Sequence, residues 1–106
     1  AGLVPGRPLE AQRPEDLVTM RSLDAHGEAS ERVHGEGLVP WASLWPGPEL
    51  VVFGHDAVRG LQLYEYAIGL DTGCVWGGTL AAQRLDTPSM PVFVPSTLPA
   101  VDFSSA

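Results

Sequence analysis

Short apolar runs separated by glycine, proline and aspartate fill the second half of the chain, and they predict β-strands. The clearest runs are residues 50–53, 66–70 and 79–85, and 92–94 is a candidate for a fourth. Each run has the length of a strand and is bounded by residues that favour turns. We therefore expect a layered sheet protein in which the loops that follow the strands carry the chemistry.

The first half of the chain is less regular. A proline and two acids, followed by apolar residues at helical spacing, predict a short helix over 14–21. A single helical turn is expected over 41–45, where two tryptophans share one side before a Pro-Gly-Pro stop. Residues 1–13 and 24–37 contain turn formers or charges and are predicted to be loops.

Two polar segments directly follow apolar runs. A Gly-His-Asp triplet containing His55 follows the first run, and an Asp-Thr-Gly-Cys segment that begins at Asp71 follows the second. Glycine lets the backbone turn sharply and approach a ligand closely. A neutral imidazole at such a place can bind a transition metal, whereas its alternative is a histidine hydrogen-bonded at a strand end. The pattern indicates a metal-site loop.

These segments also carry a family resemblance. The triplet GHD at 54–56 and the stretch GLDTGCVWGG at 69–78 resemble the carboxyl-terminal third of a calcineurin-like metallophosphoesterase. Within that superfamily the chain is most similar to the symmetrical dinucleoside-tetraphosphatases and their phosphoprotein-phosphatase-like relatives. The opening residues AGLVPG resemble the residues after the histidine of the family motif H-A-G-I/L-x-P. The resemblance covers nearly the whole chain up to about Leu85.

The resemblance implies an α/β fold in which this chain is the C-terminal fragment of a four-layer β-sandwich flanked by helices. Residues 1–86 would belong to the phosphoesterase domain, and 87–106 are expected to form a poorly structured tail. His55 would bind one of two divalent ions, such as manganese, iron, zinc or cobalt. The substrate would be a phosphate-containing small molecule, such as a dinucleoside tetraphosphate or polyphosphate, or a phosphoprotein.

The family motifs G-D-x-H, G-D-x-x-D-R-G and G-N-H-D/E do not occur in this sequence. Because these motifs supply most metal ligands and the catalytic histidine, we expect a fragment that is inactive alone. The intact protein would hydrolyse phosphoester or phosphoanhydride bonds. The alternative is a non-catalytic interaction module that kept the phosphoesterase scaffold.

Four further residues are candidates for the same site. Arg59 and Arg21 are predicted to bind substrate phosphate, because a guanidinium recognises oxyanions through two parallel donors. Arg59 can instead cap its own loop, and Arg21 can instead favour a helix dipole. Asp56 is a candidate to orient His55, with a loop-capping aspartate as the alternative. Asp71 is expected to shape the substrate mouth, or to accept backbone N–H groups in a turn.

Other chemistry-bearing residues have simpler interpretations. The Asp-Thr-Gly triplet is the signature of aspartic proteases. Its position late in the chain, and the indole and two glycines that follow it, argue against a protease active site here. Cys74 lacks a visible activating base and is expected to be a structural thiol. His26 and His34 match no ligand spacing and are expected in a solvated loop. The three tryptophans are expected in the core, with base stacking as the alternative.

Composition narrows the partners. The chain has 106 residues, a formal net charge of −7 and six basic residues that are all arginine. Such a charge repels nucleic-acid phosphate, so general nucleic-acid binding is not expected. No apolar run approaches the length of a membrane span, and no membrane partner is expected. The single Cys74 excludes an internal disulfide and suits a reducing compartment, so we expect a cytoplasmic protein.

Overall fold

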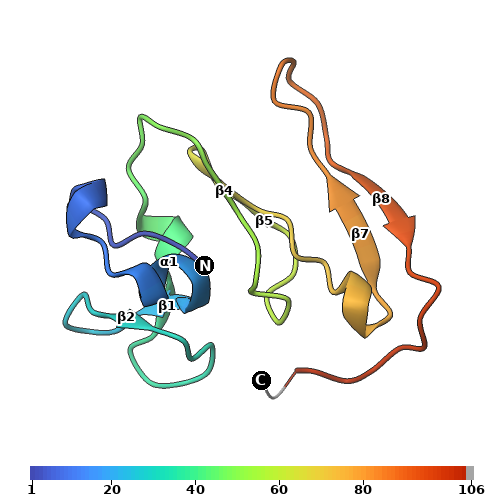
Figure 1. Ribbon diagram of the computed structural model, residues 1–106, viewed down its shortest axis with the longest axis horizontal. Helices are drawn as coiled ribbons and strands as arrows, with labels where there is room; N and C mark the ends of the chain where they lie inside the picture. Colours follow the sequence, from blue (N-terminus) through green and yellow to red (C-terminus); the bar gives the residue numbers. More distant parts are fainter. Residues whose placement is uncertain (105–106) are drawn as a thin grey trace.

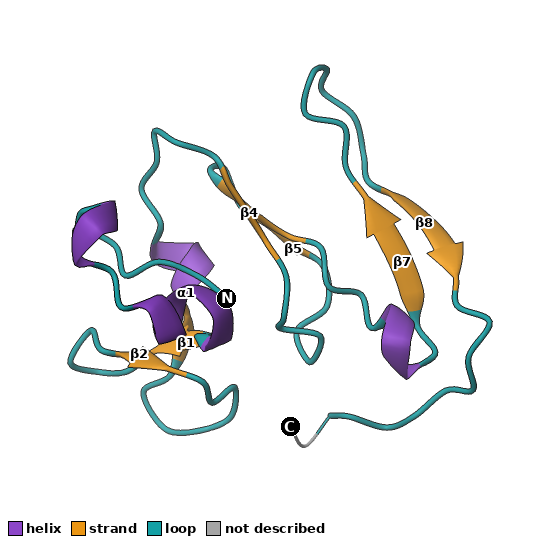
Figure 2. Cartoon of the chain, viewed as in Figure 1, coloured by secondary structure: helices purple, strands orange, loops and turns teal. Residues whose placement is uncertain are grey.

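The apolar runs of the second half do form strands, and the chain builds three small sheets one after another (Figure 1). The computed structural model describes residues 1–104. Loops connect the short elements and make up most of the chain (Figure 2). None of the helices in this described part has the length and apolar character that a membrane span requires.

The first sheet has the strand order β2-β1-β3 and is antiparallel throughout. Its members are β1 (Ser22–Leu23), β2 (Ala29–Ser30) and β3 (Val39–Pro40). We did not expect these strands, and β2 lies inside the segment 24–37 that was predicted to be a loop. Each has only two residues, so no alternation of apolar and polar positions can reveal it.

Two short helices precede this sheet: the 3₁₀ helix η1 (Leu9–Ala11) and helix α1 (Pro14–Thr19). The helix predicted over 14–21 is confirmed, but it ends two residues early. Met20 has φ −65° and ψ 146°, which is extended backbone. The Arg21 backbone N–H then donates to the Ser30 carbonyl at 2.8 Å, so pairing with β2 replaces the last helical turn.

The second sheet has the order β4-β6-β5 and mixes both pairings. Strand β4 (Val51–Phe53) pairs parallel with β6 (Ala67–Gly69), and β5 (Gln62–Leu63) pairs antiparallel with β6. Strands β4 and β6 confirm the runs 50–53 and 66–70, shortened by one or two residues. The 3₁₀ helix η2 (Trp41–Leu44) confirms the helical turn predicted before this sheet.

The last sheet is a hairpin of β7 (Thr79–Ala82) and β8 (Val92–Pro95), preceded by the 3₁₀ helix η3 (Cys74–Trp76). The strands confirm the runs 79–85 and 92–94, although β7 stops three residues early. All four residues of β8 are exposed. This strand lies within the segment 87–106, whose remaining described residues have no helix or strand.

The core lies between the first and second sheets. Trp41 is its largest fully buried side chain, and its indole lies 4.8 Å from the Phe53 ring and 6.2 Å from the Trp45 indole, measured between centroids. The core thus fastens the end of β4, where His55 follows, to the first sheet. The members of this cluster are Val4, Met20, Leu23, Trp41, Ala42, Phe53 and Ala67.

Candidate metal centre

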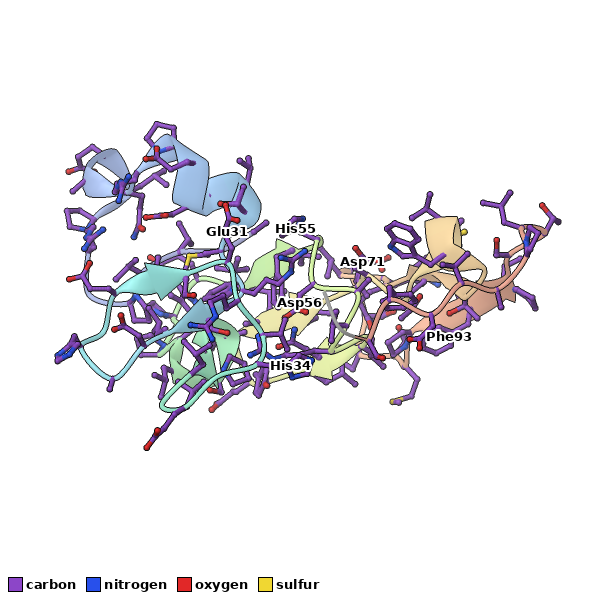
Figure 3. All side chains as sticks on the ribbon, turned by 90° about the horizontal axis from the view of Figure 1, so that it is seen from below. Glu31, His34, His55, Asp56, Asp71 and Phe93 are labelled. Atoms are coloured by element: carbon purple, nitrogen blue, oxygen red, sulfur yellow. The ribbon has the colours of Figure 1, made fainter. Side chains whose placement is uncertain are left out.

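The parallel pairing of β4 and β6 places two loops at one edge of the second sheet. Phe53 pairs with Gly69 in register, and the Leu70 N–H extends this pairing by donating to the Phe53 carbonyl at 3.0 Å. His55 and Asp71 therefore each lie two residues beyond paired positions. Carboxyl ends of parallel strands commonly carry binding groups. Figure 3 shows both side chains at this edge.

The backbone at His55 is unusual, because its φ is 79°. Among the described residues it is the non-glycine residue with a left-handed φ, a conformation that side chains with a Cβ adopt rarely and at a cost of about 1–3 kcal/mol. Its carbonyl accepts the Ala57 N–H at 3.1 Å and one Nη2–H of Arg21 at 3.5 Å. Strained residues of this kind concentrate at functional sites.

The surroundings of His55 favour its neutral form. The residue is exposed overall, but its ring is partly enclosed, and this partial burial lowers its pKa below 6.5. The guanidinium of Arg21 also lowers the pKa, whereas Asp56 and Asp71 oppose the shift. A neutral imidazole nitrogen is the form that binds a metal ion. The chemistry of His55 therefore fits one metal ligand.

The same region does not form a complete metal site. Within residues 1–104 no group of three or more histidine, cysteine, aspartate or glutamate side chains lies close enough to hold an ion. A divalent transition metal usually takes at least three protein ligands. The described chain thus supplies His55 as a single candidate ligand at this edge.

Asp56 lies beside His55 in sequence but is engaged elsewhere. Its Oδ1 accepts the Arg59 backbone N–H at 3.2 Å, and its Oδ2 accepts Arg59 Nη1–H at 2.8 Å and Gln62 Nε2–H at 3.3 Å. These are the contacts of a loop-capping aspartate. The role of Asp56 in orienting the His55 ring directly stays a prediction, which these contacts disfavour.

Arg59 is held by acceptors of the protein itself. Beyond Asp56, its Nη1 donates to the Arg21 carbonyl at 2.7 Å and its Nη2 donates to Ser22 Oγ at 2.8 Å and to the Val33 carbonyl at 3.4 Å. Few of its donors are left for a phosphate group. Substrate binding by Arg59 stays a prediction, and the alternative, in which Arg59 caps its own loop, accounts for its bonds to Asp56.

Arg21 faces the candidate site directly. Its Nη1 donates to the Glu31 carbonyl at 3.0 Å and its Nη2 to the His55 carbonyl. Its Nε is buried and has no hydrogen-bond partner in the described part of the chain. Because the Nε is buried, a substrate phosphate could meet Arg21 only through its Nη groups, and phosphate binding by Arg21 stays a prediction.

Asp71 begins a tight turn. Its Oδ1 accepts the Gly73 N–H at 3.1 Å, and Thr72 Oγ1 donates to the Thr79 carbonyl at 2.6 Å. The backbone of Gly73 is left-handed, and a Cβ at Gly78 would overlap the Thr72 carbonyl. The Asp-Thr-Gly segment thus has the geometry of the turn alternative.

The other candidate residues lie away from this edge. Trp41 belongs to the core and Trp45 packs against it, as expected, while Trp76 is exposed and lies 5.9 Å from the Phe103 ring. His34 contacts the Ser104 carbonyl through Nε2 at 2.8 Å. His26 is exposed in the turn between β1 and β2.

Sequence reasoning missed Gln62 and Ser22, which join Asp56 and Arg59 in one network. Both side chains are buried, and both contact the pair by hydrogen bonds. Neither lies in a motif, and Ser22 is 37 residues from Arg59 in the sequence. No sequence signal pointed to them.

Two surface hollows of the described chain lie away from His55. One of about 380 Å³ lies between the second sheet and the hairpin, where Leu63, Tyr64 and Met90 are among its walls. Another, of about 410 Å³, is lined by residues that include Leu3 and Trp45. His55 lines neither hollow.

Comparison with known proteins decides the family resemblance. A symmetrical bis(5'-nucleosyl)-tetraphosphatase of Ralstonia nicotianae is 38% identical over 76 residues, which are 68% of this chain and 24% of that protein. The asymmetrical bis(5'-nucleosyl)-tetraphosphatase PrpE of Anoxybacillus flavithermus is 38% identical over 80 residues, or 72% of this chain and 32% of that protein. The chain is homologous to dinucleoside tetraphosphatases. This confirms the resemblance to the calcineurin-like family.

A solved structure agrees with these homologues. The crystal structure of a proposed diadenosine tetraphosphatase superposes with a TM-score of 0.78 and 44% sequence identity, and covers 91% of this chain and 44% of its own. No family model matches the chain. The chain spans about a quarter of the length of the symmetrical tetraphosphatase from Ralstonia. The names of these homologues describe enzymes that hydrolyse dinucleoside tetraphosphates.

Proposed function

We propose that the chain is part of a metal-dependent hydrolase that cleaves a phosphoanhydride bond of a dinucleoside tetraphosphate, with His55 as one metal ligand. The observation that carries this proposal is the parallel register of β4 and β6, which sets His55 and Asp71 at the same sheet edge. The homologous tetraphosphatases supply the reaction class.

The intact protein would hold two divalent ions, of manganese, iron, zinc or cobalt. Bound ions of this type activate water and offset phosphate charge at neutral pH. Within this chain, His55 presents a neutral ring nitrogen at the edge, since its pKa is lowered mainly by partial burial. Arg21, whose Nη2 donates to the His55 carbonyl, is the candidate to bind a phosphate oxygen through its guanidinium. Asp71 shapes the neighbouring turn and limits where the substrate can lie.

Turnover would need ligands from polypeptide beyond this chain, because one imidazole cannot hold two ions. We therefore expect the 106-residue chain to be inactive alone. Substrate choice among dinucleoside polyphosphates, polyphosphate and phosphoproteins would also depend on that polypeptide. The tetraphosphate is favoured, because both homologues above are named for it.

The apolar hairpin supports the larger four-layer sandwich. Leu80, Val92 and Val94 are each at least 60% exposed, and Phe93 is 46% exposed. A two-stranded ribbon with bare faces has little stability in water. In the proposed sandwich, further strands of the domain cover these faces. The relatives are about two to four times as long as the matched part of this chain, so such strands can come from the rest of the protein. The domain would then extend past residue 86.

The experiment compares the 106-residue chain with the protein from the complete gene, each supplied with Mn²⁺ and diadenosine tetraphosphate. Chromatographic separation of the nucleotide products measures hydrolysis. We expect turnover by the complete protein and none by the chain alone. Equal turnover by both proteins would contradict the expectation that the chain alone is inactive. No turnover by either protein would favour the non-catalytic interaction module.

A further inference from the structure

We propose that Arg59 is a positioning residue, whose ion pair with Asp56 fixes the His55 loop against strand β1. This inference rests on the proposed function, because it assigns to Arg59 the task of holding a metal ligand. It replaces direct phosphate binding as the role of this guanidinium.

The ion pair is enclosed on the Asp56 side. Asp56 is 3% exposed and Arg59 is 16% exposed, and Nη1 lies 2.8 Å from Oδ2. The Arg59 backbone N–H also donates to Asp56 Oδ1, so the carboxylate binds the main chain and the side chain of one residue. Charge-assisted bonds in such an environment fix geometry more firmly than exposed ones. The pair therefore closes residues 56–59 into a rigid turn.

The other side of the guanidinium reaches the first sheet. It donates to the Arg21 carbonyl and to Ser22 Oγ. Ser22 is the first residue of β1 and is fully buried. Ser22 Oγ in turn donates to the Arg32 carbonyl at 2.5 Å. A planar fork with several donors suits such a bridge, and lysine cannot reproduce it. The turn after β4 is thus tied to a strand of another sheet.

His55 depends on this tie because its own contacts are few. The residue is exposed overall and its φ of 79° is unfavourable, and the bonds of its carbonyl to Ala57 and Arg21 hold the backbone alone. Asp56 follows it directly, so anchoring Asp56 fixes the backbone from which the imidazole projects. A metal ligand acts well only when such outer contacts hold its direction.

The exposed pair of Arg84 and Asp86 provides a matched control. Nη2 and Oδ2 are also 2.8 Å apart there, but the side chains are 69% and 65% exposed. It lies beyond β7, away from the His55 loop. Removing this pair deletes the same kind of bond without touching the network around β1.

The test uses NMR on the protein from the complete gene with the variants Arg59→Met, Arg59→Lys and Arg84→Met. The heteronuclear NOE of the His55 amide and the relaxation of its ring carbon report order on the picosecond to nanosecond scale. We expect Arg59→Met to loosen both, while the Trp41 amide stays ordered. Arg59→Lys should restore part of the order, and Arg84→Met should match the wild type. Unchanged His55 signals in Arg59→Met would overturn the inference.

Asp56→Asn serves if Arg59→Met fails to fold, since it removes the charge of the ion pair and keeps the shape of the side chain. Loosening confined to the His55 loop supports the inference, and an ordered His55 in this variant overturns it. Titration with Mn²⁺ adds a second readout, because the ion broadens nearby ring signals. Arg59→Met should raise the Mn²⁺ concentration needed to broaden His55 about tenfold; an unchanged midpoint in a loosened loop would contradict the positioning role.

The two proposals fail separately. If Mn²⁺ broadens His55 no more than the exposed His26 in the wild type, the metal-ligand proposal fails. The NOE comparison does not depend on metal and would still decide whether Arg59 orders the loop.

Discussion

Gly2 lies flat against the indole of Trp41, with no space for a Cβ atom between them. Trp41 Nε1–H donates to the Ala1 carbonyl at 3.0 Å, so the indole holds the first residues of the chain by packing and by a hydrogen bond. The same indole packs on Phe53, two residues before His55. One side chain therefore joins the opening segment to the strand that carries the candidate ligand.

We predict that Gly2→Ala lowers the free energy of unfolding by about 1–3 kcal/mol, because an added methyl group must displace the buried indole. Urea unfolding followed by tryptophan fluorescence measures the change. Gly54→Ala is the control, since a Cβ at that position meets no atom within 4 Å. Equal losses in both variants would show that the close packing at Gly2 is not the cause.

Asp56→Ala should destabilise the chain by about 3 kcal/mol, because it leaves Arg59 as an enclosed charge without its partner. This is the lower end for buried pairs, since Arg59 is 16% exposed. Asp86→Ala removes the exposed pair and should leave the free energy of unfolding nearly unchanged. The difference between the two variants in denaturant unfolding is the test. A small loss for Asp56→Ala would mean that water already solvates the pair.

Asp24 gives a pH-dependent prediction. Its Oδ1 accepts the backbone N–H of Glu28 at 2.9 Å and of His26 at 2.8 Å, and these bonds lower its pKa below 3.8. A lowered carboxylate pKa contributes stability at higher pH, which is lost as the pH falls through the folded-state pKa. Asp24→Ala should therefore lower the Tm at about pH 6 and have little effect near pH 2.

The control for this prediction is Glu36→Ala, at an exposed acid in the loop before β3. It should leave the Tm nearly unchanged at both pH values. A loss of the same size at low pH in Asp24→Ala would indicate that the carboxylate charge does not matter for the turn.

The bare hairpin should make the isolated chain self-associate. Val92 and Val94 are separated by one residue on β8, so both side chains lie on the same face of the strand, and both are mostly exposed. Val92→Lys with Val94→Lys should reduce the rise of the sedimentation coefficient with concentration. Val18→Lys, at an equally exposed position on α1, should not. A wild-type chain that stays monomeric at all concentrations would contradict this prediction.

Much of the second half was predictable from sequence, because the longer strands of the second sheet and the hairpin are apolar runs closed by turn formers. The parallel register that brings His55 and Asp71 together was not, since pairing depends on which strands meet in space. Strands of two residues, such as β1, carry no periodicity. The bonds of Arg59 to Ser22 join residues 37 apart, and no local pattern encodes them. The histidine was found through its motif, and its anchoring required the structure.

The most direct test of His55 as a ligand is the metal content of the protein from the complete gene, purified with Mn²⁺ and measured by mass spectrometry. We predict about two ions per chain for the wild type. His55→Ala should lose at least one ion, or bind Mn²⁺ about 10–100-fold more weakly. His26→Ala, which changes an exposed histidine of a distant turn, should keep both. Full metal content with unchanged affinity in His55→Ala would contradict the account.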